Sequence, residues 1–388
     1  MTNKLGGVSI FLFAAIAIGY TSCKKFQLTE VADQGTPVLP ATPLEYMKVQ
    51  TPDGEVDLRT LSNNFNVFSG TFFNSNPGLD GLSNHSITLG RVLFYDKKLS
   101  INNTIACASC HEQNKAFSDG KAASGGFGDK FTGRNSMSII NPITQNNLFW
   151  DSRASSAFDL SLRPVFNHIE MGMESDEMLL KKINNASYYA SLFQNAFGSN
   201  KITKEKISQA ISHFLNSLVT LNSKFDIASG NNFEDFTPME KAGKDLFFSG
   251  RLNCTACHAG RNFSAGEIPG SGYSSPIIKG TANIGLDLNY KDNGKENGKF
   301  RIPGLRNIEL TAPYMHDGRF ATLEDVIEHY NSGVKNHPNL DDNLRKDGLP
   351  KRLNLTQLEK EAVVAFLKTL TDKSYTSDTK YSNPFPKN

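Results

Sequence analysis

Two short motifs dominate the chemistry that this sequence could support. Each is a Cys-x-x-Cys-His unit; the first comprises Cys107, Cys110 and His111, and the second comprises Cys254, Cys257 and His258. The two thiols of such a unit form thioethers with the vinyl groups of a haem, and the adjoining histidine ligates the iron. Two units in one chain therefore predict two covalently bound haem c groups.

Zinc and disulfides are the alternatives for these four cysteines. Two Cys-x-x-Cys pairs could form a Cys₄ zinc site, but Cys110 and Cys254 lie much farther apart in the sequence than the roughly 12–20 residues usual between such pairs. A disulfide framework is typical of small secreted domains, and it does not explain a histidine after each pair. Haem attachment accounts for the whole pattern.

The fifth cysteine belongs to a segment with the features of an export signal. Lys4 precedes an apolar run from Val8 to Tyr20, and Thr21-Ser22-Cys23 follows the run. The run is shorter than the roughly 20 apolar residues that cross a bilayer, and a cysteine after small residues is typical of a lipoprotein signal. We expect a periplasmic protein anchored to a membrane through a lipid on Cys23. An ordinary signal peptide with an incidental cysteine is the alternative.

Composition excludes several other classes of protein. The 388 residues include 41 Lys and Arg against 39 Asp and Glu, which gives a net charge of +2 without any long basic run. A nucleic-acid partner is therefore not favoured. The content of 38% hydrophobic residues supports buried cores.

The chain is predicted to consist of two haem domains with short flanking segments. The expected divisions are a signal peptide at 1–22, a tether at 23–51, an N-terminal haem domain at 52–230, a C-terminal haem domain at 231–375 and a tail at 376–388. Related sequences precede the two haem motifs, at Gly90-Arg-Val-Leu-Phe-Tyr95 and Gly243-Lys-Asp-Leu-Phe-Phe248. We interpret this recurrence as internal duplication, with a helix leading to each haem.

Secondary structure is predicted to be mainly α-helical and rich in loops. From Ile207 to Leu221 the apolar residues recur at helical spacing, and Thr356-Gln-Leu-Glu359 has the capping-box pattern that opens a helix. No alternating pattern extends over several strands. The expected fold is two cytochrome c-like domains in which the haems supply much of the core.

Taken together, the motifs resemble the bacterial di-haem cytochrome c peroxidase superfamily, and in particular its MauG-like branch. The resemblance covers nearly all of residues 83–370. Its most specific segments are Leu89 to Tyr95, Gly133 to Ser136, Phe149 to Arg153, Ile169 to Met171 and Leu310 to Arg319. It implies that the first haem reacts with hydrogen peroxide and that the second supplies electrons from a small redox protein, a cytochrome c or a cupredoxin. Homodimers are common in this superfamily.

The resemblance also implies roles for individual residues. Glu170 matches the carboxylate above the peroxidatic haem, where peroxide chemistry needs a base that then acts as an acid. Trp150 matches an aromatic residue between the haems that is suited to electron transfer. Asn135, Thr311 and Pro313 match the oxygen ligands of an inter-domain Ca²⁺.

The second haem is where this sequence departs from the typical peroxidases. In those proteins a methionine is its second axial ligand, and here the matching position is Tyr330, as in the MauG-like branch; His329 and Met315 are rivals. A phenolate stabilises ferric iron, whereas a thioether raises the haem potential. Around the first haem, Leu160 replaces a glutamine and His168 replaces a proline. His168 is either a second proton-transfer group or a surface histidine.

The sequence therefore predicts a di-haem c-type peroxidase that reduces hydrogen peroxide with electrons from a small redox protein. One alternative is a MauG-like oxidase that modifies residues of a partner protein. The other is a di-haem electron carrier without catalysis, which requires both irons to have two protein ligands.

Overall fold

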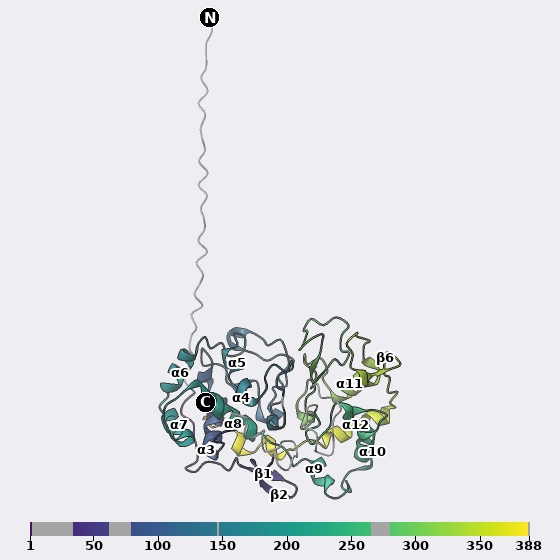
Figure 1. Cartoon of the computed structure of the whole chain (residues 1–388), viewed down its shortest axis with the longest axis horizontal. Coiled ribbons are helices and arrows are strands. Elements are labelled where there is room, and N and C mark those ends of the chain that lie inside the picture. The colour runs from purple at the N-terminus through teal and green to yellow at the C-terminus, as the bar shows by residue number, and fades with distance from the viewer. Residues whose placement is uncertain (2–33, 62–78, 146, 265–279, 387–388) are drawn as a thin grey trace.

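The computed structural model describes residue 1 and residues 34–61, 79–145, 147–264 and 280–386. Two lobes lie side by side, the first formed by the earlier part of the chain and the second by the later part (Figure 1). Each lobe has its own cluster of buried apolar side chains. The described chain has no helix that is both long and apolar enough to cross a membrane. The predicted signal peptide and Cys23 lie outside the described residues.

The first lobe is built around a pair of packed helices. Helix α3 packs against α8 and also against α7. Its buried side chains, with those of α7 and α8, form much of the first core. The helices of this lobe are α3 (Asn84–Tyr95), α4 (Ala157–Leu160), α5 (Arg163–Phe166), α6 (Asp176–Asn184), α7 (Tyr188–Phe197) and α8 (Lys204–Ser217).

The second lobe repeats this arrangement with fewer elements. Helix α10 packs against α12, and α12 also contacts α11. The α-helices here are α9 (Lys224–Ser229), α10 (Pro238–Phe248), α11 (Leu323–Glu328) and α12 (Gln357–Lys368). A π-helical turn, His329–Gly333, continues directly from α11. Phe225 of α9 packs against Phe263 and Phe366, so α9 belongs to the second core although it precedes the expected boundary at residue 230.

The described strands form three two-stranded antiparallel hairpins. They are β1 (Lys48–Thr51) with β2 (Gly54–Asp57), β3 (Thr281–Ala282) with β4 (Phe300–Arg301), and β5 (Arg345–Lys346) with β6 (Leu349–Pro350). Loops and single 3₁₀ turns make up most of the remaining described chain. The expectation of a mainly helical, loop-rich protein is confirmed.

A glycine sets the distance between the helices in each central pair. A Cβ atom on Gly90 of α3 would lie 1.9 Å from the carbonyl oxygen of Ala210 in α8. A Cβ on Gly243 of α10 would lie 1.8 Å from the carbonyl oxygen of Ala362 in α12. Both distances are far below van der Waals contact, so only glycine permits these crossings. The likeness of the two pairs supports internal duplication, which remains a proposal.

The sequence patterns locate the main helices well. Helix α12 begins after Thr356, whose hydroxyl accepts a hydrogen bond from the amide of Glu359 in the expected capping box. Helix α8 buries Ile207, Ile211 and Phe214 as the periodicity predicts, but it spans Lys204–Ser217 and ends before Leu221. Its apolar pattern continues past the helix because the following residues remain in the core.

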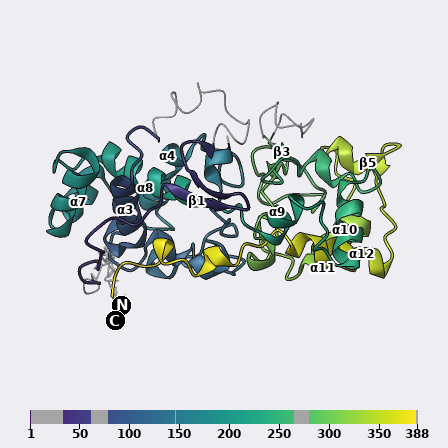
Figure 2. The ribbon, with the colours of Figure 1, turned by 90° about the horizontal axis from the view of Figure 1, so that it is seen from below.

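Both ends of the described chain depart from the expected divisions. The predicted tether, 23–51, includes Tyr46, which is 0% exposed in the first core, and it includes strand β1. The predicted tail, 376–388, includes Tyr381 and Phe385, which are also buried in the first core. The hydroxyl of Tyr95 donates a 2.6 Å hydrogen bond to the carbonyl of Tyr381. Figure 2 shows the final yellow segment running from the second lobe back along the first.

We predict that Gly243→Ala destabilises the protein by about 1–3 kcal/mol, because the added methyl group must force α10 away from α12. Gly250→Ala is the control, since no atom lies within 4 Å of its Cβ position and its φ angle is not positive. Chemical denaturation of both variants would measure the change. Equal stabilities of the two variants would contradict the proposed close contact.

Candidate haem sites

The first Cys-x-x-Cys-His motif lies in a 3₁₀ turn beyond the end of α3. Cys107 begins this turn, Cys107–Ser109, and no disulfide involves Cys107 or Cys110. Nδ1 of His111 lies 2.8 Å from the carbonyl oxygen of Phe117. Burial lowers the pKa of His111, so the ring is neutral and donates its Nδ1 proton to that carbonyl. Nε2 is left for a metal, in the arrangement usual for histidine ligands.

The second motif repeats this local geometry. Cys254 begins the 3₁₀ turn Cys254–Ala256, beyond the end of α10. Nδ1 of His258 lies 3.0 Å from the carbonyl oxygen of Phe263, and burial lowers the pKa of this histidine as well. Both histidines are therefore oriented by a carbonyl a few residues later in the chain.

The four cysteines have the surroundings of attachment sites for an apolar group. Burial raises the pKa of Cys110 to about 11 and the pKa values of Cys107, Cys254 and Cys257 to about 12. Thiols in such surroundings are poor free thiolates. Within the described residues, no three His, Cys, Asp or Glu side chains converge as a metal-binding group. The four cysteines thus do not form the Cys₄ zinc arrangement.

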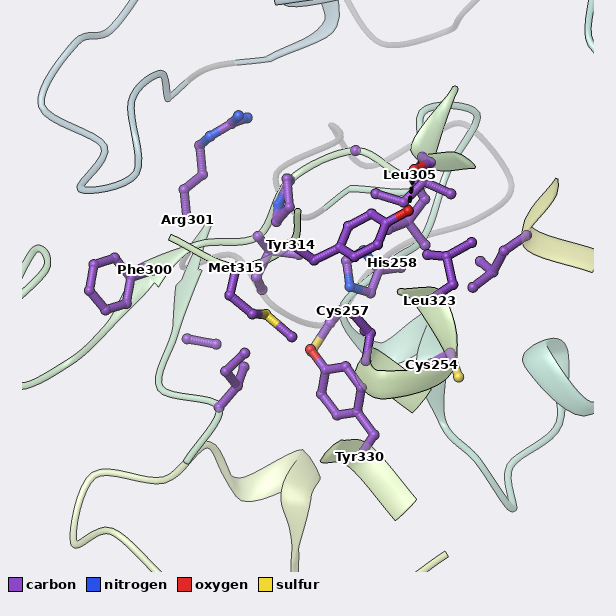
Figure 3. Close-up of a pocket in the computed structure, with 18 of the residues that line it drawn as sticks. Cys254, Cys257, His258, Phe300, Arg301, Leu305, Tyr314, Met315, Leu323 and Tyr330 are labelled. Carbon is purple, nitrogen blue, oxygen red and sulfur yellow. Dashed lines mark hydrogen bonds between the residues drawn. The ribbon is translucent and has the colours of Figure 1, made fainter. Parts of the chain in front are cut away.

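A cavity in the second lobe has the donors and walls that a haem requires (Figure 3). Cys254, Cys257 and His258 line it, and so does Tyr330 from the far side. Much of the remaining wall is apolar, including Leu323 and other aliphatic side chains. Two thiols, one free imidazole nitrogen and an apolar enclosure match the chemistry of a covalently attached haem.

Glu170 lies beside the first motif. A Cβ atom on Gly126 would lie 3.3 Å from the Cα of Glu170, and the Cys110 thiol lies 3.9 Å from the carbonyl oxygen of the preceding Gly125. Burial raises the pKa of Glu170, and the positive charge of Arg153 partly offsets this effect. The backbone holds the residue in place, because its carbonyl accepts a 3.0 Å hydrogen bond from the amide of Phe127.

A surface hollow leads to Glu170. Its lining includes His168 and Arg153, together with Arg163 and Lys204. The side chain of His168 is exposed. Leu160 does not line this hollow but packs against the first core. Arg153 falls within a segment singled out in the sequence, yet its effect on Glu170 was not predicted because it acts across space.

Trp150 joins the two lobes. Its indole Nε1 donates a 2.9 Å hydrogen bond to the carbonyl of Asn135, and its own carbonyl accepts a 2.7 Å bond from the amide of Arg301. The indole ring also lies 6.5 Å from the ring of His316, centroid to centroid. Trp150 lines the second-lobe cavity while belonging to the first-lobe sequence, which fits a position between two haems.

Comparison with known proteins identifies the family to which this chain belongs. A family model described as di-haem cytochrome c peroxidase matches residues 84–232. The cytochrome c551 peroxidase of Nitrosomonas europaea is 32% identical over 283 residues, which cover 73% of this chain and 79% of the relative. The chain belongs to the di-haem cytochrome c peroxidase family. The resemblance inferred from the motifs is therefore confirmed.

Relatives of this di-haem family member include MauG-type proteins. The methylamine utilization protein MauG of Methylophilus methylotrophus is 28% identical over 297 residues, 76% of this chain and 84% of the relative. A crystal structure of a MauG-like protein associated with microbial copper homeostasis is 32% identical, with a TM-score of 0.69, and covers 79% of this chain and 94% of that one. The family implies two haem c groups and an oxidoreductase.

Two of the three residues considered as a second axial ligand of the second haem, Tyr330 and Met315, line the second-lobe cavity, and His329 does not. Tyr330 lies on the π-helical turn, and no described residue forms a hydrogen bond with its hydroxyl. Nε2 of His329 instead faces the carbonyl oxygen of Ile284 at 2.9 Å. The side chains of Tyr330 and Met315 point into the same space beside Cys257 (Figure 3). Burial raises the pKa of Tyr330 above its ordinary value, so a phenolate here needs a nearby cation.

The three residues expected to bind Ca²⁺ line one cavity. Asn135, Thr311 and Pro313 all border the space that Trp150 also lines. The side-chain Nδ2 of Asn135 donates to the carbonyl of Lys121, which leaves Oδ1 as a candidate ligand. This site in the di-haem protein remains a proposal.

We predict that Tyr330→Phe changes the optical and EPR spectra of the second ferric haem, because phenylalanine has no oxygen to donate to the iron. Met315→Leu is the matched control and should leave those spectra intact. If only Met315→Leu altered the spectra, Met315 would be the ligand.

Proposed function

We propose that this protein is a periplasmic di-haem c-type peroxidase that reduces hydrogen peroxide to water with electrons from a small redox protein. The observation that carries the proposal is the position of Glu170. Its backbone lies beside the segment that the Cys110 thiol contacts, the residue borders a surface hollow, and burial raises the pKa of its carboxyl group. A general acid and base at a peroxide site needs these three properties: proximity, access and a pKa nearer to neutrality.

The catalytic role that we assign to Glu170 is proton movement. When bound, the first haem supplies the iron at which peroxide is reduced, and the second haem supplies stored electrons. The Glu170 carboxylate would take a proton from one oxygen of hydrogen peroxide. The resulting carboxylic acid returns the proton to the departing oxygen, which leaves as water. The positive charge of Arg153 lowers the pKa of Glu170 and so opposes the effect of burial.

The role that we assign to Trp150 is the transfer of electrons from the second haem to the first. Hydrogen bonds to Asn135 and from Arg301 fix the residue in both lobes, and its indole borders the second-lobe cavity. A rigid aromatic ring at this position is suited to passing electrons toward the first site. The donor that we propose is a cytochrome c or a cupredoxin.

A MauG-like oxidase is the second candidate, and Tyr330 is the observation that favours it. A phenolate ligand stabilises higher oxidation states of iron and makes the second haem a poorer reservoir of one easily donated electron. Stopped-flow spectra after one equivalent of peroxide, followed by reduced cytochrome c, distinguish the candidates. Rapid oxidation of the cytochrome supports the peroxidase. A long-lived oxidised protein that the cytochrome reduces slowly supports oxidation of a partner protein.

We further propose that a lipid on Cys23 anchors the mature protein and that Ca²⁺ binds at Asn135, Thr311 and Pro313. The support for the anchor is the sequence pattern around Cys23. The support for Ca²⁺ is that these three residues, each with an oxygen atom that can bind a hard cation, border the same cavity. Mass spectrometry of the exported protein tests the anchor, and metal analysis after chelation tests Ca²⁺.

We predict that Glu170→Gln lowers kcat for peroxide by roughly 10²–10⁴-fold, because an amide cannot accept and return the proton. Glu174→Gln is the control, since Glu174 is exposed four residues later in the same loop. Haem absorbance per protein should be unchanged in both variants. Full turnover by Glu170→Gln with normal haem content would refute the acid/base role.

The pH dependence follows from the raised pKa of Glu170. The free enzyme needs the carboxylate as a base, so kcat/KM for peroxide falls as the pH drops through this pKa. The fall should occur above the pH expected for an ordinary glutamate, about 4.3. Arg153→Gln removes the charge that lowers the pKa of Glu170. The acidic limb of the kcat/KM profile should therefore move to higher pH.

The control for this experiment is Arg163→Gln. Arg163 lines the same hollow, but it pairs with Asp159 and does not contribute to the pKa of Glu170. In the Arg163→Gln variant, the acidic limb of the kcat/KM profile should lie at the same pH as in the unmodified protein. An acidic limb that moved equally in both variants would reject a specific influence of Arg153.

A further inference from the structure

Arg301 carries a charge that the described protein does not neutralise. It lies on strand β4, its exposed fraction is 7%, and its side chain lines the cavity assigned to the second haem. Among the described residues it forms no ion pair. Other arginines of this lobe behave differently, since Arg306 pairs with Asp226 at 2.7 Å and Arg319 pairs with Asp287 at 2.6 Å.

The contacts of the Arg301 guanidinium are neutral and incomplete. Nη1 donates to the side-chain oxygen of Gln145, and Nη2 lies 3.6 Å from the sulfur of Met137. Nε is buried without a hydrogen-bond partner. Burial alone lowers the pKa of Arg301 to about 10, so the side chain stays protonated near neutral pH. Burial of an isolated cation is unfavourable, and an anion in the cavity would offset this cost.

We propose that Arg301 binds a propionate carboxylate of the second haem. A haem carries its two propionates on the edge opposite the vinyl groups that form the thioethers. Cys254 and Arg301 lie on opposite sides of the cavity view in Figure 3, which agrees with this polarity. The free Nε–H and the adjacent Nη–H form the planar fork that accepts a carboxylate with two parallel hydrogen bonds.

This pairing would connect the charge of the second haem to the residue between the lobes. The amide of Arg301 donates a 2.7 Å hydrogen bond to the carbonyl of Trp150. The side chain that holds the propionate and the backbone that holds Trp150 therefore belong to one residue. Arg301 thus acts as a positioning residue and also sets the electrostatic potential at the second haem.

Potentiometric titration of both haems in the full-length holoprotein tests the proposal. Arg301→Gln should lower the midpoint potential of the second haem and leave that of the first in place, because an uncompensated propionate stabilises ferric iron. Arg301→Lys should lower the midpoint potential of the second haem by a smaller amount. Gln145→Ala is the matched control, since it removes the neutral partner of Arg301 and keeps the charge. Unmoved potentials in haem-loaded Arg301→Gln, or an equal shift in Gln145→Ala, would overturn the proposal.

A crystal structure of the unmodified holoprotein gives a test that needs no variant. The expected result is a propionate oxygen within hydrogen-bond distance of Nε and one Nη of Arg301. Propionates bound only by other groups, with Arg301 held by Gln145 and water, would overturn the proposal. The inference rests on haem attachment at Cys254 and Cys257. A protein mass with only one haem would refute that attachment, whereas two haems with unmoved potentials would refute the role of Arg301 alone.

Discussion

Both lobes depend on one constraint: in each, two helices cross so closely that only a glycine fits at the crossing. At Gly90 and at Gly243, the backbone of one helix meets a carbonyl of its partner, so neither crossing tolerates a Cβ atom. Helix α3 ends at Tyr95 and α10 ends at Phe248. The two Cys-x-x-Cys-His turns follow those ends, and each histidine is then oriented by a carbonyl a few residues later. Local backbone geometry thus orients both proposed iron ligands.

The two proposed haem sites of this family member differ in the side chains that lie near them. Near the first site, burial raises the pKa of the Glu170 carboxyl group and the charge of Arg153 lowers it. In the second lobe, a phenol and a thioether point into an enclosed space. The first arrangement suits proton transfer at an accessible iron, and the second suits an iron that exchanges electrons without binding substrate. The difference between the lobes follows from a few side chains on similar helical frames.

Much of this organisation could be predicted from the sequence because the signals are local. The haem motifs, the helix before each motif and the cap at Thr356 each depend on residues within one or two turns of chain. The packing of Tyr46, the effect of the Arg153 charge on the pKa of Glu170 and the burial of Arg301 depend on residues that are not neighbours in the sequence. No periodicity or spacing encodes these contacts. The family resemblance identified Glu170 and Tyr330, but only the structure relates them to their surroundings.

The return of the final segment to the first lobe affects how the protein can fold. Tyr375, Tyr381 and Phe385 complete a core whose other members precede residue 222. In the order of the chain, the second lobe is therefore an insertion within the first. A growing chain can assemble the second lobe while the first still lacks its last aromatic side chains. The lobe that contains the proposed peroxide site is consequently the last to close, after its C-terminal residues have been synthesised.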